Sequence, residues 1–333
     1  MLLSNSSPRE RLSRLGLAYL TMTVCHLAGV YALQYAVMLL HPAWLTAWWF
    51  PWVLSLLPLY GLGLPALWLC LRGIPTHPHN PDCTLQKAPA QKPSLGARGW
   101  LTLLVIAFGC MTLGGLVGNR IMAILSAVTG KDYAFALNSM VNETPAWFTL
   151  ICTCICAPLG EELLFRKLLI DRTRGYGDAI AILLSGLLFG LFHGNLFQFF
   201  YAFLVGMVLA YVYTRTGRYL PCVAMHAAIN FMGSVVTPLL TRRLIPYLED
   251  PEAMLNLFAD PQALVCYAIL LLWQYGMLIA GLALLATRFG RRALSRGSLP
   301  LDGERTRAIC NPGLIACAAV MAAIMVVNLI PAG

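Results

Sequence analysis

Apolar residues fill most of this sequence and fall into runs that short polar segments separate. Nine runs can be traced, at about residues 15–40, 46–72, 99–119, 146–170, 178–194, 197–214, 219–240, 262–287 and 309–330. An α-helix needs roughly 20 apolar residues to cross a bilayer, and the shortest runs suffice if those helices are little tilted. The pattern predicts an all-α protein, a polytopic transmembrane helix bundle of about eight to nine spans.

The composition agrees with a membrane protein. Of the 333 residues, 59% are hydrophobic and 11% are charged, and the mean hydropathy is +0.72. These values lie outside the usual range of soluble domains. The net charge of +9 is not gathered on one basic face and comes with no nucleic-acid-binding motif, so the expected partner is the lipid bilayer and not a nucleic acid. The cysteines lie mostly inside the apolar runs and give no disulfide framework.

The basic residues indicate an orientation. If the N-terminus is cytoplasmic, 19 of the 23 Lys and Arg residues fall in cytoplasmic segments and four in outer ones. Such a bias follows the positive-inside rule. The sequence therefore predicts an integral membrane protein whose N-terminus lies in the cytoplasm.

The sequence divides into three regions: N-terminal spans over 1–144, a helical core over 145–240 and C-terminal spans over 241–333. Within the first region, 73–98 is rich in Pro, Lys and Gln and has no hydrophobic period, which predicts a cytoplasmic linker. Residues 121–128 are amphipathic, and a short surface helix and an ordinary outer loop fit them equally well.

Small residues recur every four positions on the fifth and sixth runs. Gly186 and Gly190 do so on the fifth, and Gly206 belongs to the equivalent series on the sixth. Such series let helix backbones approach closely inside a membrane. They predict a tight helical hairpin that turns at Gly194 and Asn195.

One apolar run carries charges in its interior. Glu161 and Glu162 are adjacent there, and Arg166 follows. A charge at bilayer depth costs at least ~2.5–3.5 kcal/mol and usually marks a pathway or a reactive site. Glu162 and Arg166 are four residues apart with the acid first, the favourable order for an ion pair on a helix. This pairing leaves Glu161 free for chemistry, although a cluster that only locks helices together is the alternative.

Two further polar pairs lie on later runs. His193 follows Phe189 by four residues, and Asn230 follows His226 by four, so each pair shares a helix face. At a rise of 1.5 Å per residue, Glu161 and the two histidines lie within about 10 Å of one another in depth. They can therefore converge inside the bundle.

These residue types permit two kinds of hydrolytic site. A buried glutamate can act as the general base that activates water, while a histidine and an asparagine amide stabilise a tetrahedral oxyanion. Alternatively, Glu161, His193 and His226 form a set of zinc ligands, although the sequence has no HExxH motif. The residues alone leave both mechanisms open.

The ordered motifs EExxxR at 161–166, FxxxH at 189–193 and HxxxN at 226–230 resemble those of the CAAX protease and bacteriocin-processing (CPBP, or Abi) family of intramembrane peptidases. The resemblance extends over about residues 145–240, under a third of the sequence. It implies a membrane-embedded endopeptidase that cleaves a peptide or protein substrate near the membrane surface.

The resemblance also implies a role for each motif residue. Glu161 activates the water with the help of His193, while His226 and Asn230 form the oxyanion site. The remaining motif residues, Glu162 and Arg166, serve as supporting groups that position the others. The family's favoured mechanism uses no metal, so no cofactor is expected, and zinc is the alternative.

The resemblance leaves the substrate open. Eukaryotic relatives trim prenylated CAAX proteins, while many bacterial relatives are linked to bacteriocin maturation, self-immunity or signalling-peptide processing. The compact motif block looks bacterial, which implies a bacterial cytoplasmic membrane and argues against a prenylated substrate. The alternative from another class is a non-enzymatic immunity or scaffold protein, or a transporter, but the sequence has no internal repeat of the transporter kind.

Overall fold

The computed structural model describes residues 6–76, 95–131, 133, 144–248, 251–289 and 305–329. Every regular element in these ranges is helical, which confirms the predicted all-α class. Among the described residues, seven helical segments are long and apolar enough to cross a membrane, and α9 (Asp178–Phe192) and α17 (Pro312–Val327) are shorter apolar helices. Each apolar run of the sequence thus corresponds to a helix of a polytopic bundle.

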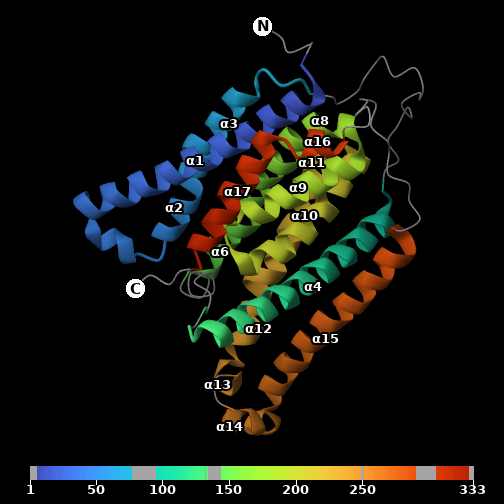
Figure 1. The fold of residues 1–333 in the computed structure, drawn as a ribbon. Coiled ribbons are helices and arrows are strands. Elements are labelled where there is room, and N and C mark those ends of the chain that lie inside the picture. The colour runs from blue at the N-terminus through green and yellow to red at the C-terminus, as the bar shows by residue number, and fades with distance from the viewer. Residues whose placement is uncertain are drawn as a thin grey trace.

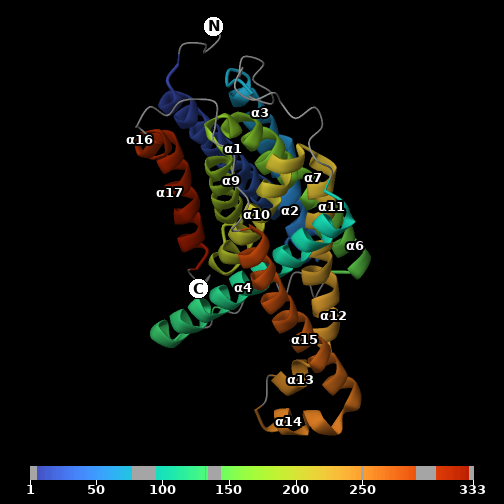
Figure 2. The same cartoon turned by 90° about the vertical axis from the view of Figure 1, so that its right-hand side faces the viewer.

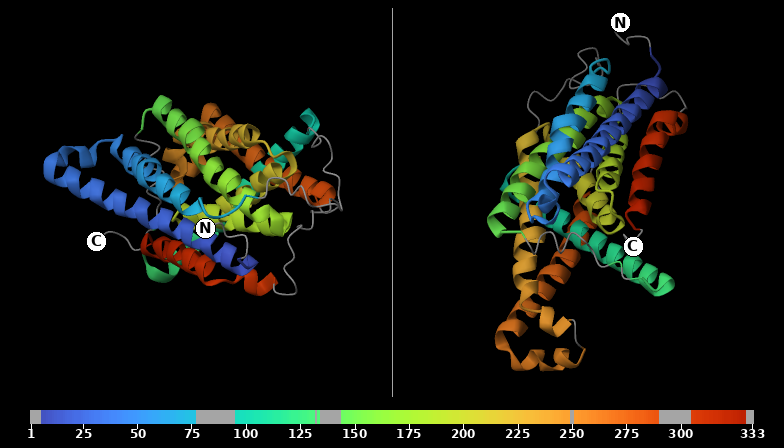
Figure 3. Two further views of the ribbon diagram at one scale, coloured as in Figure 1. Left: turned by 90° about the horizontal axis from the view of Figure 1, so that it is seen from above. Right: turned by 90° about the vertical axis from the view of Figure 1, so that its left-hand side faces the viewer.

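The N-terminal helices and the last helix form one side of the bundle (Figures 1 and 3). They are α1 (Pro8–Leu40), a 3₁₀ turn (Pro42–Thr46), α2 (Phe50–Pro58), a π turn (Leu59–Gly63), α3 (Leu64–Leu71) and α17. At the contact between α1 and α17, Gly16 faces the backbone of Gly313, and the Ser13 hydroxyl accepts the Gly313 N–H at 3.0 Å. Because neither glycine carries a side chain, the two helices approach backbone to backbone.

The third predicted run extends further than expected. Helix α4 (Ala97–Thr129) continues without a break through 121–128, so the suggested separate surface helix or loop there was wrong. No proline or glycine interrupts the apolar period after Gly118, and the helix ends only where Gly130 adopts a left-handed φ of 68°. Most of the predicted linker over 73–98 lies outside the described residues.

An irregular central rod follows. It consists of α6 (Ala146–Ile151), a π turn (Cys152–Cys156), α7 (Ala157–Glu162), a π turn (Leu163–Leu168), α8 (Leu169–Thr173) and a 3₁₀ turn (Arg174–Tyr176). The predicted hairpin comes next: α9 turns at Gly194, with φ 60°, into α10 (Leu196–Thr216). A Cβ at Gly190 would lie 3.0 Å from the carbonyl oxygen of Phe199, so the glycine series brings the two helices together as predicted.

Most of the remaining helices lie on the other side of the bundle. They are α11 (Tyr219–Phe231), a π turn (Met232–Val236), α12 (Thr237–Arg242), α13 (Ile245–Leu248), α14 (Pro251–Leu255), a 3₁₀ turn (Asn256–Ala259), α15 (Pro261–Leu284) and a π turn (Leu285–Phe289). Helix α16 (Arg305–Ile309) instead contacts α1 on the first side. Helices α12 and α15 extend beyond the other helices, and α13 and α14 lie at their far end (Figure 2).

Two buried apolar clusters flank the central rod. One cluster joins α1, α3, α9 and α17 around Tyr19 and Phe165. The other joins α4, α10 and α11 around Leu209 and Tyr211. Phe165 and Ile170 of the rod belong to opposite clusters, so the rod is held from both sides.

Asp260 organises the tip formed by α13 and α14. Its Oδ1 accepts the N–H groups of Gln262 and Ala263 at 3.0 and 3.1 Å, which caps α15. Its Oδ2 accepts from Arg243 and from the Tyr247 hydroxyl, both at 2.9 Å. The hydrogen bond from the Ala263 N–H, followed by the one from Tyr247, lowers the pKa of Asp260 below its ordinary 3.8.

Acid should therefore loosen this tip. A carboxylate whose folded-state pKa is lowered stabilises the fold at neutral pH, and that stabilisation is lost as the pH falls through the folded-state pKa, below 3.8. We expect the first-turn amides of α15 to lose protection from hydrogen exchange between pH 6 and pH 3, after correction for intrinsic rates. Asp260→Ala should show the low protection at both pH values. Equal protection of the wild-type amides at both would contradict this role.

Candidate active site

A proline determines the shape of the central rod. Pro158 has no N–H to donate, and the preceding Ala157 donates its N–H five residues back, to the carbonyl of Cys152. The carbonyl of Thr153 is therefore left without a backbone donor. The N–H of Ala157 bonds to Cys152 instead, and Pro158 has no N–H. The Asn230 side chain supplies the donor instead, with Nδ2 2.7 Å from the Thr153 oxygen. The widened turn thus fixes Asn230 at the site.

The same relation recurs before two other prolines. Leu64 precedes Pro65 and donates to Leu59, and Thr237 precedes Pro238 and donates to Met232. In each case a π turn ends two residues before the proline. Three of the five π turns in the described residues therefore have a sequence cause, and two of these three lie beside the candidate site.

Side chains from other helices bond to further carbonyls of the rod. Four such donors are hydroxyl groups: Tyr60 to Cys156 (2.6 Å), Tyr219 to Leu159, Tyr19 to Leu164 (2.6 Å) and Ser185 to Phe165 (2.8 Å). Gly160 allows the first of these bonds, because a Cβ there would overlap the Tyr60 hydroxyl. In a membrane interior such donors replace the water that would solvate a free carbonyl. They hold the segment that carries both glutamates from several sides.

Glu162 and Arg166 form the predicted ion pair at the centre of this segment. Arg166 Nε lies 3.0 Å from Glu162 Oε2, and both side chains have 0% exposure. Arg166 also donates from a terminal nitrogen to the Ser185 hydroxyl at 3.2 Å, and its guanidinium lies 4.7 Å from the ring centre of Phe189. The Phe of the FxxxH motif is thus a cation–π partner of the arginine. Because a buried charge without a partner is costly, the pair is an obligatory unit.

His226 lies between the two glutamates. Its Nδ1 is 2.9 Å from Glu162 Oε1, and its Nε2 is 3.7 Å from Glu161 Oε2. The contact with Glu162 did not follow from the spacing of the motifs, which linked Glu162 to Arg166 alone. Glu162 therefore connects the arginine on one side to the imidazole on the other.

His193 is oriented by the backbone of its own helix. Its Nδ1 lies 2.7 Å from the carbonyl oxygen of Phe189. A carbonyl oxygen can only accept, so Nδ1 carries the hydrogen and Nε2 remains as the nitrogen for other work. The Phe189 ring packs edge-on against both histidines, with ring centres 4.8 Å from His193 and 5.6 Å from His226. One aromatic ring thereby fixes the separation of the two imidazoles.

Four of the predicted residues meet at one cavity of about 180 Å³: Glu161, His193, His226 and Asn230 all line it. Glu162 and Arg166 lie behind its wall. The side chain of Glu161 is 16% exposed, whereas that of Glu162 is not exposed at all. The structure therefore divides the two acids into one that faces the cavity and one that is enclosed.

Tyr201 and Thr153 are among the lining residues that sequence reasoning did not single out. Tyr201 lines the cavity, and its hydroxyl accepts from Gln198 Nε2 at 2.8 Å. Thr153 also lines it, beneath Asn230. Pro158 was the signal in the sequence that could have indicated Thr153. A proline at 158 has no N–H, so a carbonyl in the preceding turn needs a donor from elsewhere.

Two of the four imidazole nitrogens in the zinc alternative already have other partners. Within the described ranges, no group of three or more His, Cys, Asp and Glu side chains is arranged to hold a metal ion. Nδ1 of His193 contacts a carbonyl oxygen and Nδ1 of His226 a carboxylate. Only the Nε2 atoms would be left to join Glu161 as ligands.

Residues 143–232 match a family model described as type II CAAX prenyl endopeptidase Rce1-like. This segment is therefore similar to the CAAX protease family. The match contains all three motifs, so it confirms the family resemblance predicted from them. It supports an intramembrane protease in general, in an integral membrane protein. Comparisons with curated proteins and with solved structures gave no match.

The link between Pro158 and Asn230 can be tested by mutation. Pro158→Ala supplies an N–H to the rod, so the Thr153 carbonyl no longer needs Asn230. We expect a thermal midpoint in detergent no lower than that of the wild type, since an interior proline is itself unfavourable, and peptide hydrolysis slower by about tenfold.

A double variant distinguishes this route from a general disturbance. If Pro158→Ala acts through Asn230, adding it to Asn230→Ala should slow hydrolysis little further, because coupled residues are not additive. Full additivity of the two effects would contradict the link.

Proposed function

We propose that this protein is an intramembrane endopeptidase in which Glu161 activates the attacking water. The observation that carries the proposal is the convergence of Glu161, His193, His226 and Asn230 on one cavity. Three separate helical segments contribute these groups, and a buried ion pair lies directly behind them. A cluster that only locked helices together would not require a carboxylate facing a cavity.

The contacts of His226 suggest its role. Its two ring nitrogens face two carboxylate oxygens, with Nδ1 2.9 Å from Glu162 and Nε2 3.7 Å from Glu161. Carboxylate oxygens accept hydrogen bonds. In the proposed arrangement His226 therefore donates Nδ1–H to Glu162 and directs Nε2–H towards Glu161 and the cavity.

In the proposed reaction a water lies between Glu161 and the substrate. Glu161 takes a proton from this water, and the oxygen adds to the carbonyl carbon of the peptide bond. His226 Nε2–H and the second amide hydrogen of Asn230 donate to the resulting oxyanion. His193 Nε2 accepts from the water and orients it. The proton on Glu161 then passes to the leaving nitrogen as the C–N bond breaks, giving a carboxylic acid and an amine.

The membrane and the class of substrate are also part of the proposal. The placement of the basic residues supports a cytoplasmic N-terminus, and the compact motif block supports a bacterial cytoplasmic membrane. The matched model is named for CAAX prenyl endopeptidases. For this protein we propose a peptide or protein substrate held at the membrane, without requiring a prenyl group.

Glu161→Gln should abolish hydrolysis of membrane-proximal peptides in detergent, because an amide cannot accept the proton of the water. The loss should be at least about 10³-fold, within the combined effect of a general base and water positioning. Glu10→Gln is a matched control: Glu10 completes the capping box of α1, where glutamine serves as well. Retained activity in a folded Glu161→Gln protein would refute the assignment.

Metal analysis separates the two hydrolytic mechanisms. We expect the purified active protein to contain far less than stoichiometric zinc and to keep its activity in EDTA. Zinc at one equivalent, lost together with activity in His193→Ala and His226→Ala, would instead identify a metallopeptidase.

A further inference from the structure

Two helix faces lead away from the candidate site with a spacing of four residues. On the rod, the residues that line the cavities at this spacing are Pro145, Thr149, Thr153, Ala157 and Glu161. On the partner segment, formed by α11, the π turn and α12, they are Asn230, Ser234, Pro238 and Arg242. Residues four apart share a helix face. We call these two rows of residues stripes. Apart from the charged residues Glu161 and Arg242 at their ends, all members are small or polar, so the facing stripes leave space between the two segments.

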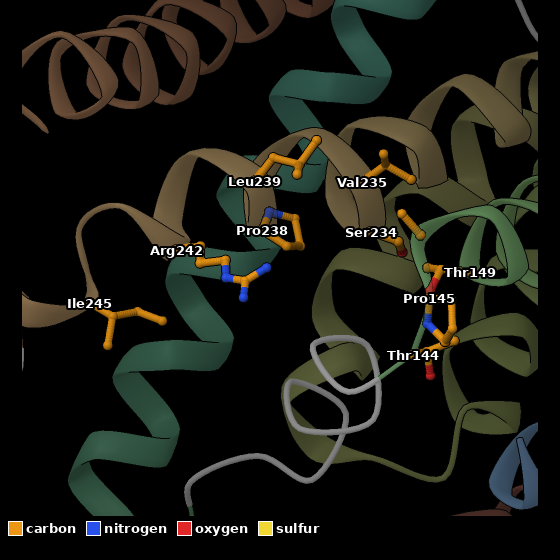
Figure 4. Close-up of a pocket in the computed structure, with 10 residues that line it drawn as sticks. Thr144, Pro145, Thr149, Ser234, Val235, Pro238, Leu239, Arg242 and Ile245 are labelled. Carbon is orange, nitrogen blue, oxygen red and sulfur yellow. The ribbon is translucent and has the colours of Figure 1, made fainter. Parts of the chain in front are cut away.

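The space continues from the catalytic cavity into a larger one. A second cavity, of about 530 Å³, lies between the start of α6 and the α12 end of the partner segment (Figure 4). Ser234 lines both cavities. The two cavities are therefore adjacent, and together they form a groove, which we define by the two stripes above.

The wall of the larger cavity contains an arginine side chain and a hydroxyl group without a hydrogen-bond partner among the described residues. Of the described residues that line it, Arg242 alone is charged, and its side chain extends along α12 towards Pro238 (Figure 4). Thr149 lines this cavity with 2% exposure, and among the described residues no group bonds to its hydroxyl. A buried hydroxyl without a partner is unfavourable, so a ligand in the groove would satisfy it.

We propose that the groove binds an extended segment of the substrate whose carboxylate pairs with Arg242. This inference rests on the proposed peptidase function and specifies its substrate. Asn230 and Arg242 are 12 residues apart, or about 18 Å along the helix at 1.5 Å per residue. An extended peptide spans about 3.3–3.6 Å per residue. The carboxylate therefore lies about five residues from the scissile bond, and the Thr149 hydroxyl bonds to the peptide backbone between them.

The position of the groove suits a substrate at the membrane surface. Its far end lies beside Trp147, which is 62% exposed, and Trp48 packs edge-on against the neighbouring Phe148 at 5.2 Å. Exposed tryptophans of this kind concentrate where a membrane meets water. A peptide can thus keep its carboxylate at the surface while its scissile bond reaches Glu161.

The carboxylate has two sources, the C-terminus of the substrate or an acidic side group, and one set of peptides tests both. Each carries the same cleavable sequence, with a free C-terminus, a C-terminal amide, or an amide plus one Asp, at three to eight residues from the scissile bond. The wild type should cleave the peptides with a carboxylate near position five with a KM about tenfold or more lower than the plain amides. Preference for the free acid alone identifies a C-terminus, and equal preference for Asp identifies any carboxylate.

Arg242→Gln should raise the KM of the carboxylate peptides to that of the amides and leave kcat unchanged, and Arg242→Lys should restore part of the difference. Arg120→Gln is the matched control, because Arg120 is an exposed arginine on α4 that does not line the groove. If wild type cleaves acids and amides alike, or if Arg242→Gln keeps the preference, the proposal is wrong.

Thr149→Val provides a second test that does not depend on charge. Valine keeps the shape and removes the unpaired hydroxyl, so the thermal midpoint should not fall. The KM of every peptide long enough to pass Thr149 should rise severalfold, whereas a purely structural threonine would leave KM unchanged and overturn this part.

Binding to Glu161→Gln separates this proposal from the proposed function. If no peptide is hydrolysed by the wild type but labelled carboxylate peptides still bind Glu161→Gln in preference to amides, the groove stands and the peptidase assignment fails. If peptides are hydrolysed without any carboxylate preference, the groove assignment fails and the peptidase stands. If peptides neither bind nor react, both fail.

Discussion

The structure depends on one requirement of the membrane interior: every backbone carbonyl of a spanning segment needs a donor. Pro158 removes a donor from the helix that carries the paired glutamates. The Asn230 amide meets the deficit at Thr153, and hydroxyl groups from four other positions bond to neighbouring carbonyls. The missing backbone donor is thus replaced by side-chain bonds from other segments, and these bonds fix the position of this helix in the bundle.

This way of building a site yields preorganisation. The groups around Glu161 are held by bonds to backbone or by the buried pair of Glu162 and Arg166. His226 gains its orientation from Glu162, and His193 gains its orientation from the carbonyl of Phe189. Fixed dipoles need little reorganisation when charge develops, which is the main source of electrostatic catalysis.

Sequence reasoning found the helices and the motif residues because both leave local signals. Apolar runs report the spans, and a spacing of four reports which residues share a face, as for Glu162 with Arg166. It missed what depends on the approach of distant segments: the contact of His226 with Glu162 and the bond of Asn230 to Thr153. It also stopped α4 too early, because Arg120 resembled the end of a span although no residue there breaks a helix.

The origin of the donors has a consequence for how the protein is made. Tyr19 lies on α1, Tyr60 on the π turn before α3, Ser185 on α9, and Tyr219 and Asn230 on α11. The rod is synthesised before the last three have entered the membrane, so its carbonyls must wait for partners that emerge later. The site can assemble only after α11 has been inserted into the membrane. Until then the helix that carries both glutamates lacks several of the side-chain donors to its carbonyls. Hydrolytic activity is thereby tied to near-complete insertion of the protein.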